Sequence, residues 1–380
     1  MMRRYSTKLG RTLAASSALV ALMATGGIGS AAAQEGAGVS PVQDGRIGYV
    51  MTNKYWAVYQ TPNAEQECPN GFNDGPREQF KLLYPEDGTQ RTLIETHLER
   101  EAEIWHPSTS EEPYPFKEAQ GPIAMGLDLD GKVDPTDFRS PDGDEGIDPE
   151  VSRVIGWVAN YRGPDGTIYH FENKYVQENR FDRQMIELTG VDSLVNDDDV
   201  TVTTYRGLDT LLTDATGKDF IPGGTQRADH RFGKRFSQSF KGKIVDGVLT
   251  TEPADLIIPW SATFDTNTNQ PVKALRFKLK LTPEGAEGIM AGYAPIDGWY
   301  YRLTKAWSTH HQSYGQLSSP SVYRALRRLA DAYPDPETGE NTAISGALDV
   351  KFTQVFIIHP DDEPAVAQDG ERQRNVAAAD

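Results

Sequence analysis

Alternation between apolar and polar residues dominates the middle of this 380-residue chain. In "ALRFKLKL", every second position is apolar and the positions between are basic, as in a strand with one buried face. Similar short runs occur in "DVTVTTYRG", "GKIVDGVLTT" and "DLIIPW". Many short strands with turns between them are typical of a sandwich or a closed sheet. We predict a mainly β protein, an antiparallel β-sandwich of jelly-roll type with a few peripheral helices.

Three further stretches carry strand-like patterns. Apolar and polar residues alternate in "PIAMGLDLD", which predicts a strand over 122–130 with Asp128 and Asp130 side by side on one face. The runs "RVIGWVANYRG" and "TIYHFENKYV" flank Pro-Asp-Gly, which predicts a hairpin over 153–176. No βαβ alternation and no fixed repeat is visible, which argues against doubly wound and solenoid folds.

Helical spacing occurs in two places. In "RTLIETHLEREAEIW", apolar residues three and four apart predict an amphipathic helix over 91–105. In "SSPSVYRALRRLADAYP", Ser319 suits a cap, Pro320 the first helical position, and Pro334 a stop. We therefore predict a second helix between these two prolines.

The first residues have the form of an export signal. Four basic residues precede the apolar run "LAASSALVALMA" from Leu13 to Ala24, and Ala31 and Ala33 form an A-x-A cleavage pattern. About 12 apolar residues are too few to span a bilayer, which needs roughly 20. The pair Arg3-Arg4 leaves open a twin-arginine signal beside the general secretory one. We expect a periplasmic or secreted protein with no membrane span.

These patterns suggest boundaries along the chain. We predict a signal peptide over 1–33, a disordered segment over 34–46 and a disordered tail over 364–380. Between them lie an N-terminal strand and helix region over 47–120, a β-sandwich core over 121–310, and a C-terminal helix and closing strand over 311–363.

Charge and cysteine content narrow the function classes. The formal net charge of −17 repels phosphate backbones and attracts cations, which argues against nucleic-acid binding. The single cysteine, Cys68, excludes an internal disulfide and a cysteine-rich zinc site. Stability must therefore come from the core, from bound ions or from both.

The most distinctive chemistry lies in "GLDLDGKVDPTDFRSPDGDEGIDPE", residues 126–150. This segment offers many hard oxygens and no His or Cys, which suits calcium rather than zinc. It is not an EF-hand, because a loop that starts at Asp128 or Asp142 has Arg at position twelve. Either the segment binds a divalent cation or it is a solvated acidic loop. The candidate ligands are Asp128, Asp130, Asp134, Asp137, Asp142, Asp144 and Asp148.

Two other clusters could carry chemistry. In "AWSTHHQSYG", His310, His311 and Tyr314 could act in proton transfer or hold a metal, or could have a structural role. In "ADHRFGKRF", a local excess of Arg, Lys and His could receive an anionic ligand or pair with the acidic loops. No nucleophile-elbow, zincin, Walker or dinucleotide motif is present.

The runs "GLDLDG", "PDGDEGID", "NDDDVTVTTYRG" and "GKIVDGVLTTEPADLIIPW" resemble a group of uncharacterised exported bacterial β-rich proteins with an Asp-rich loop. The resemblance covers roughly residues 120–300 and implies no activity and no catalytic residues.

Together these features predict an exported protein that binds a divalent cation, with calcium as the preferred ion. We expect it to act as a ligand-binding or accessory protein of the cell envelope. Its partner would be a small molecule, a glycan or a protein. Two alternatives stay open: a secreted or periplasmic hydrolase or lyase using His310, His311 and Tyr314, and a scaffold subunit of an envelope assembly.

Overall fold

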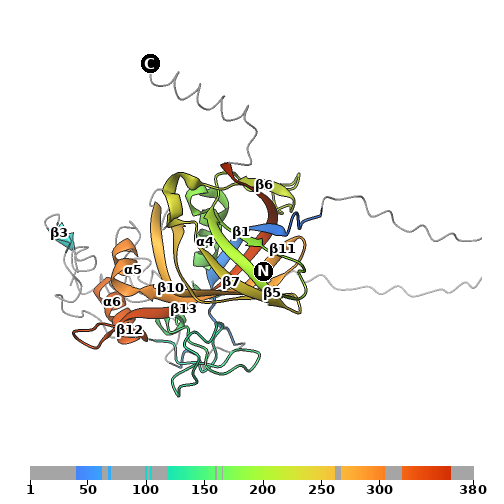
Figure 1. Ribbon diagram of the computed structural model, residues 1–380. Helices are drawn as coiled ribbons and strands as arrows, with labels where there is room; N and C mark the ends of the chain where they lie inside the picture. The colour runs from blue at the N-terminus through green and yellow to red at the C-terminus, as the bar shows by residue number, and fades with distance from the viewer. Residues whose placement is uncertain are drawn as a thin grey trace, which may run out of the picture. The chain divides into compact units, whose positions relative to one another are not determined.

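The computed structural model describes residues 40–61, 67–69, 99–100, 103–104, 118–158, 161–164, 166–261, 267–303 and 319–360. The prediction of a mainly β protein is confirmed, since most described residues outside loops lie in one large mixed sheet (Figure 1). Its strands are β1 (Arg46–Trp56), β4 (Gln184–Thr189), β5 (Asp197–Arg206), β6 (Gly224–Arg227), β7 (Ser239–Val245), β8 (Val248–Thr251), β9 (Ala254–Ser261), β10 (Asn267–Leu281), β11 (Gly285–Pro295), β12 (Ala332–Pro334) and β13 (Asn341–Ile358).

The sheet closes on itself. Its hydrogen-bonded order runs β1-β4-β5-β7-β8-β10-β11-β13, and β13 then pairs with β1. Each of these neighbouring pairs is antiparallel, whereas β6 joins β13 in parallel and β9 and β12 pair with β10 and β13. The hydrogen bonds thus run around one closed sheet, and two separate sheets of a sandwich are not confirmed.

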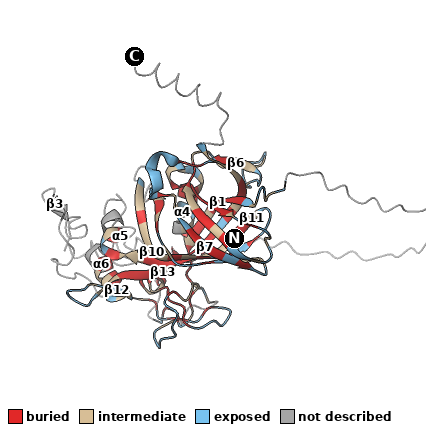
Figure 2. Ribbon diagram, in the orientation of Figure 1, coloured by how far each residue is buried: buried red, intermediate tan, exposed pale blue. Residues whose placement is uncertain are grey.

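An apolar core fills the inside of the closed sheet. Alternate residues such as Tyr49, Leu188, Leu249 and Leu279 have no exposed surface, because a period of two sends them all to the same face. Figure 2 shows the buried positions recurring along the strands. The predicted alternation of β10 is confirmed, with Leu275, Phe277, Leu279 and Leu281 buried.

A smaller apolar cluster lies on the opposite face of β1, β4 and β13. Val50, Met185 and Val355 are buried there against Ala228, which follows β6. The segment between β5 and β7 therefore covers part of the outer face of the closed sheet, and it carries the 3-10 helix η4 (His230–Arg235).

The predicted hairpin over 153–176 is wrong, because helices α3 (Val151–Ile155) and α4 (Thr167–Glu178) occupy this region. The side chains that suggested strands pack as helical faces: Val151, Val154 and Ile155 are buried at spacings of three and four. On α4, Gln177 donates to the carbonyl of Thr52, so the helix lies against β1. Packing on the sheet has overridden local β preference.

Two other predictions differ from the structure. The stretch 122–130 is not a strand and forms only an isolated bridge at Ile123. At its end, the N–H of Leu129 donates to the side chain of Asp148 instead of to a neighbouring strand. Within 91–105, the described residues Glu99–Arg100 and Glu103–Ile104 form the strand pair β2–β3 instead of a helix. The helix predicted after Ser319 is confirmed as α6 (Ser319–Arg328). Among the described residues, the other helices are α5 (Ile296–Leu303) and the 3-10 turn η3 (Arg180–Asp182).

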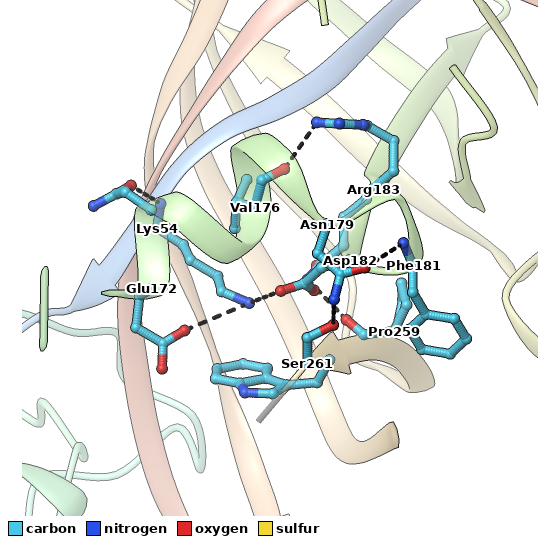
Figure 3. Close-up of polar contacts among 12 residues, drawn as sticks. Lys54, Glu172, Val176, Asn179, Phe181, Asp182, Arg183, Pro259 and Ser261 are labelled. Carbon is cyan, nitrogen blue, oxygen red and sulfur yellow. Dashed lines mark hydrogen bonds and ion pairs between the residues drawn. The ribbon is translucent and has the colours of Figure 1, made fainter. Parts of the chain in front are cut away.

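A buried ion cluster joins β1, α4 and η3 (Figure 3). The side chains of Lys54 and Asp182 are both 0% exposed, and their Nζ and Oδ2 atoms lie 2.9 Å apart. Glu172 Oε2 lies 3.7 Å from the same Nζ, which also sits 3.9 Å from the centroid of the Trp260 ring. A buried charge is tolerated only when it is paired, so this cluster fixes how α4 and η3 dock on β1.

The cluster contains two carboxylates and one ammonium group. Burial raises the pKa of Glu172 to about 7 and also raises the pKa of Asp182, while the charge of Lys54 opposes both shifts. Lys54 lies closer to Asp182 than to Glu172, at 2.9 Å against 3.7 Å.

Replacing Lys54 by methionine removes the only cation of this cluster and leaves Asp182 buried without its ion pair. We expect a loss of about 3 to 5 kcal/mol in the free energy of unfolding. Urea denaturation measures it. The matched control is Lys351→Met, which breaks a half-exposed pair with Glu287 and should change stability by less than about 1 kcal/mol. Equal losses in both variants would contradict the assignment.

The raised pKa of Glu172 makes stability depend on pH. The unfolded carboxyl ionises near 4.5 and the folded one near 7, so the folded state holds the proton more tightly. Its contribution is present below pH 4.5 and is lost as pH rises through 7. Glu172→Gln should therefore be more stable than the wild type at pH 8, and the difference should shrink toward pH 4. Denaturation curves of both proteins across this range test it.

Candidate metal centre

The segment 126–150 folds as a loop that brings its two ends together. The bridges Phe138↔Ile147 and Ile123↔Arg139 hold its middle, where Ala124, Phe138 and Ile147 form a small buried cluster. Proline and glycine interrupt any longer strand, so the loop turns back on itself. As a result Asp148, at one end, meets the backbone of Leu129 and Asp130 at the other.

Hydrogen bonds set the position of both ends. Asp148 Oδ2 accepts from the N–H groups of Leu129 at 2.6 Å and Asp130 at 3.3 Å. The hydroxyl of Ser345 on β13 donates to the carbonyl of Asp148. Arg276 on β10 donates to the carbonyls of Asp128 at 2.8 Å and Leu129 at 2.9 Å. The loop is thus anchored on two strands of the closed sheet.

This anchoring gathers three carboxylates. One side-chain oxygen each from Asp128, Asp130 and Asp148 lie within 4.8 Å of one another. Calcium binds oxygen at roughly 2.3 to 2.6 Å, so two ligands of one ion are at most about 5 Å apart. The three oxygens therefore fall within the span of a single coordination sphere. Lys132 Nζ lies 2.9 Å from Asp130 Oδ2 and places a side-chain cation beside the triad.

The triad lies at the edge of a pocket of about 400 Å³. Its wall joins the loop to Tyr293 on β11 and to the residues that follow α6. Arg153 contributes positive charge but is paired with Glu150, at 3.0 Å. Acidic groups outnumber basic ones in the wall. The lining carboxylates are Glu118, Asp130, Asp134, Asp137, Asp148, Glu150 and Asp331.

Three of these carboxylates are partly stripped of water. Burial raises the pKa of Asp148 to about 6 and that of Asp331 to about 7, and it also raises the pKa of Glu150. Hydrogen bonds from Leu129 and Ser345 oppose the shifts of Asp148 and Asp331 without cancelling them. Neutralising this charge is favourable, and a proton or a metal cation can each do it.

The sequence prediction and the structure overlap in part. Asp128, Asp130 and Asp148 come together, and Asp134 and Asp137 line the adjoining pocket. Asp142 and Asp144 are exposed and belong to neither group; Asp144 lies 4.0 Å from Lys278 instead. Because both lie at the tip of the loop, its fold carries them away from the triad.

Sequence reasoning missed Asp331, which follows α6 and approaches the pocket only through the fold. Its Oδ1 accepts from the N–H of Ser345, the same residue whose hydroxyl holds Asp148. A single aspartate after a helix has no pattern that marks it as a site residue. Another acidic run, Asp197 to Asp199, begins β5, where Asp199 pairs with Lys241. It contributes nothing to the metal-ligating group found among the described residues.

His310, His311 and Tyr314 lie outside the described residues, and so do residues 1–33. Cys68 is buried, as expected of a lone thiol. Within the described segments no helix combines the length and the apolar character that crossing a bilayer requires.

Comparison with protein-family models, with curated proteins and with solved structures gives no match for this chain.

Proposed function

We propose that this protein is exported and binds a hard divalent cation through Asp128, Asp130 and Asp148. Calcium is the preferred candidate. The observation that carries the proposal is the approach of their three carboxylate oxygens to within 4.8 Å in a loop anchored on β10 and β13. In the absence of a cation these charges repel one another. A divalent ion converts that repulsion into attraction and stabilises the loop.

The donor set favours calcium over the other common metals. The group contains no His or Cys, the ligands that zinc prefers. Magnesium demands a near-ideal octahedron at about 2.0 to 2.1 Å, whereas calcium accepts 6 to 8 oxygens in irregular geometry. The three aspartates come from an irregular loop, and water and neighbours in the pocket wall would complete the coordination. This arrangement suits calcium.

In the cell the cation would act as a structural tie. The loop packs through Leu129 against β11 and β13 and borders a pocket of about 400 Å³, so ordering the loop also shapes the pocket wall. The amino-terminal pattern supports export to a compartment in which calcium is available and disulfides are the usual alternative stabiliser. We therefore infer a ligand-binding or accessory role at the cell envelope, with a small molecule, a glycan or a protein as partner.

Calcium should stabilise the folded protein and the gain should depend on Asp148. At about 100 times the dissociation constant, binding to the folded state alone adds about 2.7 kcal/mol. Melting curves of the protein with calcium and with a chelator measure the gain. Asp148→Asn should abolish it, while Asp142→Asn, the same change at an exposed position of the same loop, should retain it. Identical melting of the wild type in both conditions would refute the proposal.

Removing the neighbouring ammonium group should tighten calcium binding. Lys132 Nζ contacts the carboxylate of Asp130 and competes with a metal for it. We expect Lys132→Gln to lower the calcium dissociation constant about two- to fivefold in a calorimetric titration. Lys241→Gln removes the same charge from a pair on β5 and β7 and serves as the control. Equal tightening in both variants would assign the effect to net charge alone.

A further inference from the structure

A second pocket, of opposite charge, lies beside η4 on the outer face of the closed sheet. It encloses about 710 Å³, within the usual range for sites that bind small organic molecules. Part of its wall is apolar, including Leu208 and Ile358. The polar part of the wall consists of Arg180, Arg206, Arg227, Asp229, His230 and Arg231.

Positive charge exceeds negative charge in this wall. Asp229 is shared by two arginines, since Arg206 Nη1 and Arg231 Nε both donate to its carboxylate. Arg227 pairs with Asp209 at 2.7 Å. Arg180 has no carboxylate at ion-pairing distance within the described residues. The chain as a whole has a net charge of −17, so specific contacts must hold this local excess of guanidinium groups together.

Arg206 shows how the pocket is built. The residue is only 6% exposed, and its Nε and Nη2 donate to the carbonyls of Phe181 at 3.0 Å and Arg180 at 3.1 Å. Its guanidinium group also stacks on the Phe181 ring, 4.7 Å from the centroid. These contacts hold the 3-10 turn η3 against β5, and so they hold Arg180 at the pocket wall.

A relay of side chains ends at His230 in the same wall. The Oε2 atom of Glu187 on β4 lies 3.2 Å from His359 Nε2. The other ring nitrogen of His359, Nδ1, lies 3.4 Å from His230 Nε2. Tyr205 on β5 places its ring edge-on to His359, 5.0 Å between centroids. Glu187 is 5% exposed, so its charge is held close to the two imidazoles. The groups thus follow one another in the order carboxylate, imidazole, imidazole, and His230 belongs to the pocket wall.

Neutral imidazoles can satisfy both contacts of this relay. When His359 donates through Nε2 to Glu187 and carries no other proton, its Nδ1 accepts from His230 Nε2, and His230 Nδ1 is an acceptor. One added proton at His230 Nδ1 turns it into a donor, and Glu187 offsets the new charge through the relay. An anion in the pocket favours this second state because it accepts the hydrogen bond.

We propose that this pocket binds a small organic molecule carrying a carboxylate or phosphate group, that Arg180 is its main charge partner, and that His230 takes up a proton when the ligand binds. The apolar part of the wall would receive the carbon skeleton. Besides the ligand, the charged and titratable groups around His230 are Glu187, His359, Tyr205, Asp229, Arg231, Arg180, Arg206 and Arg227.

Calorimetric titration with succinate and with inorganic phosphate tests the binding. At least one of the two should bind saturably in the millimolar range, and the better probe identifies whether a planar or a tetrahedral group fits. Arg180→Gln should weaken that binding roughly 10- to 100-fold, the usual effect of losing a charge-assisted hydrogen bond. Arg139→Gln changes net charge equally at an exposed pair with Glu145 and should leave binding unchanged.

Proton uptake tests the relay separately. Succinate is fully ionised at pH 7.5, so binding enthalpies in buffers of different ionisation enthalpy report protons taken up by the protein. The wild type should take up a proton, up to one for each ligand, and Glu187→Gln should bind with much less uptake. The absence of saturable binding for both probes, or equal affinities in Arg180→Gln and Arg139→Gln, would overturn the pocket. Unchanged uptake in Glu187→Gln would overturn the role of His230.

Discussion

The pairing of β1 with β13 is the constraint on which the rest of this structure depends. Without it the sheet would have two long edges, each with unpaired backbone donors and acceptors and an open route from water to the apolar core. With it, strands from both ends of the described chain become neighbours, and Thr52 reaches the carbonyl of Lys351, 299 positions away. The buried ion pair of Lys54 then fixes α4 and η3 against β1.

Closure also decides where chemistry can lie. The inside of the sheet is filled by apolar side chains, so charged groups gather where loops and helices meet the ends and the outer face of the strands. β13 serves both pockets: Ser345 near its start holds Asp148, and His359 follows its end. Fourteen extended residues span up to about 45 Å. The acidic and basic pockets therefore lie toward opposite ends of one strand.

The sequence identifies β5 and β7 to β10, because one face of each is buried and a period of two is then visible. No such run marked β1, β4, β11 or β13. It fails where one pattern fits two structures. The residues around Val151–Ile155 and Thr167–Glu178 have apolar positions that fit both a strand and a helix, and only their packing on β1 and β13 selects the helix. The closure itself has no sequence signal, because pairing partners some 300 residues apart leave no local trace.

The candidate sites divide in the same way. Asp128, Asp130 and Asp148 could be proposed from their density in one segment, and the loop does gather them. Asp331 could not, since it comes from another part of the chain. The cluster at 227–235 was visible as a local excess of basic residues, yet Arg180, Glu187 and His359 join it only through the fold. A high local density of charged residues marks site residues that belong to one segment. Site residues from other parts of the chain become visible only in the folded structure.

The distance along the chain between β1 and β13 has a consequence for the order of folding. A sheet that closes through its first and last strands cannot complete its hydrogen bonding until the C-terminal strand has been synthesised, and loop closure over such a separation is entropically costly and slow. Until then β1 lacks one of its two neighbours, and the core beneath it stays open to solvent. The complete hydrogen-bonded ring of strands can therefore form only after β13 has been synthesised.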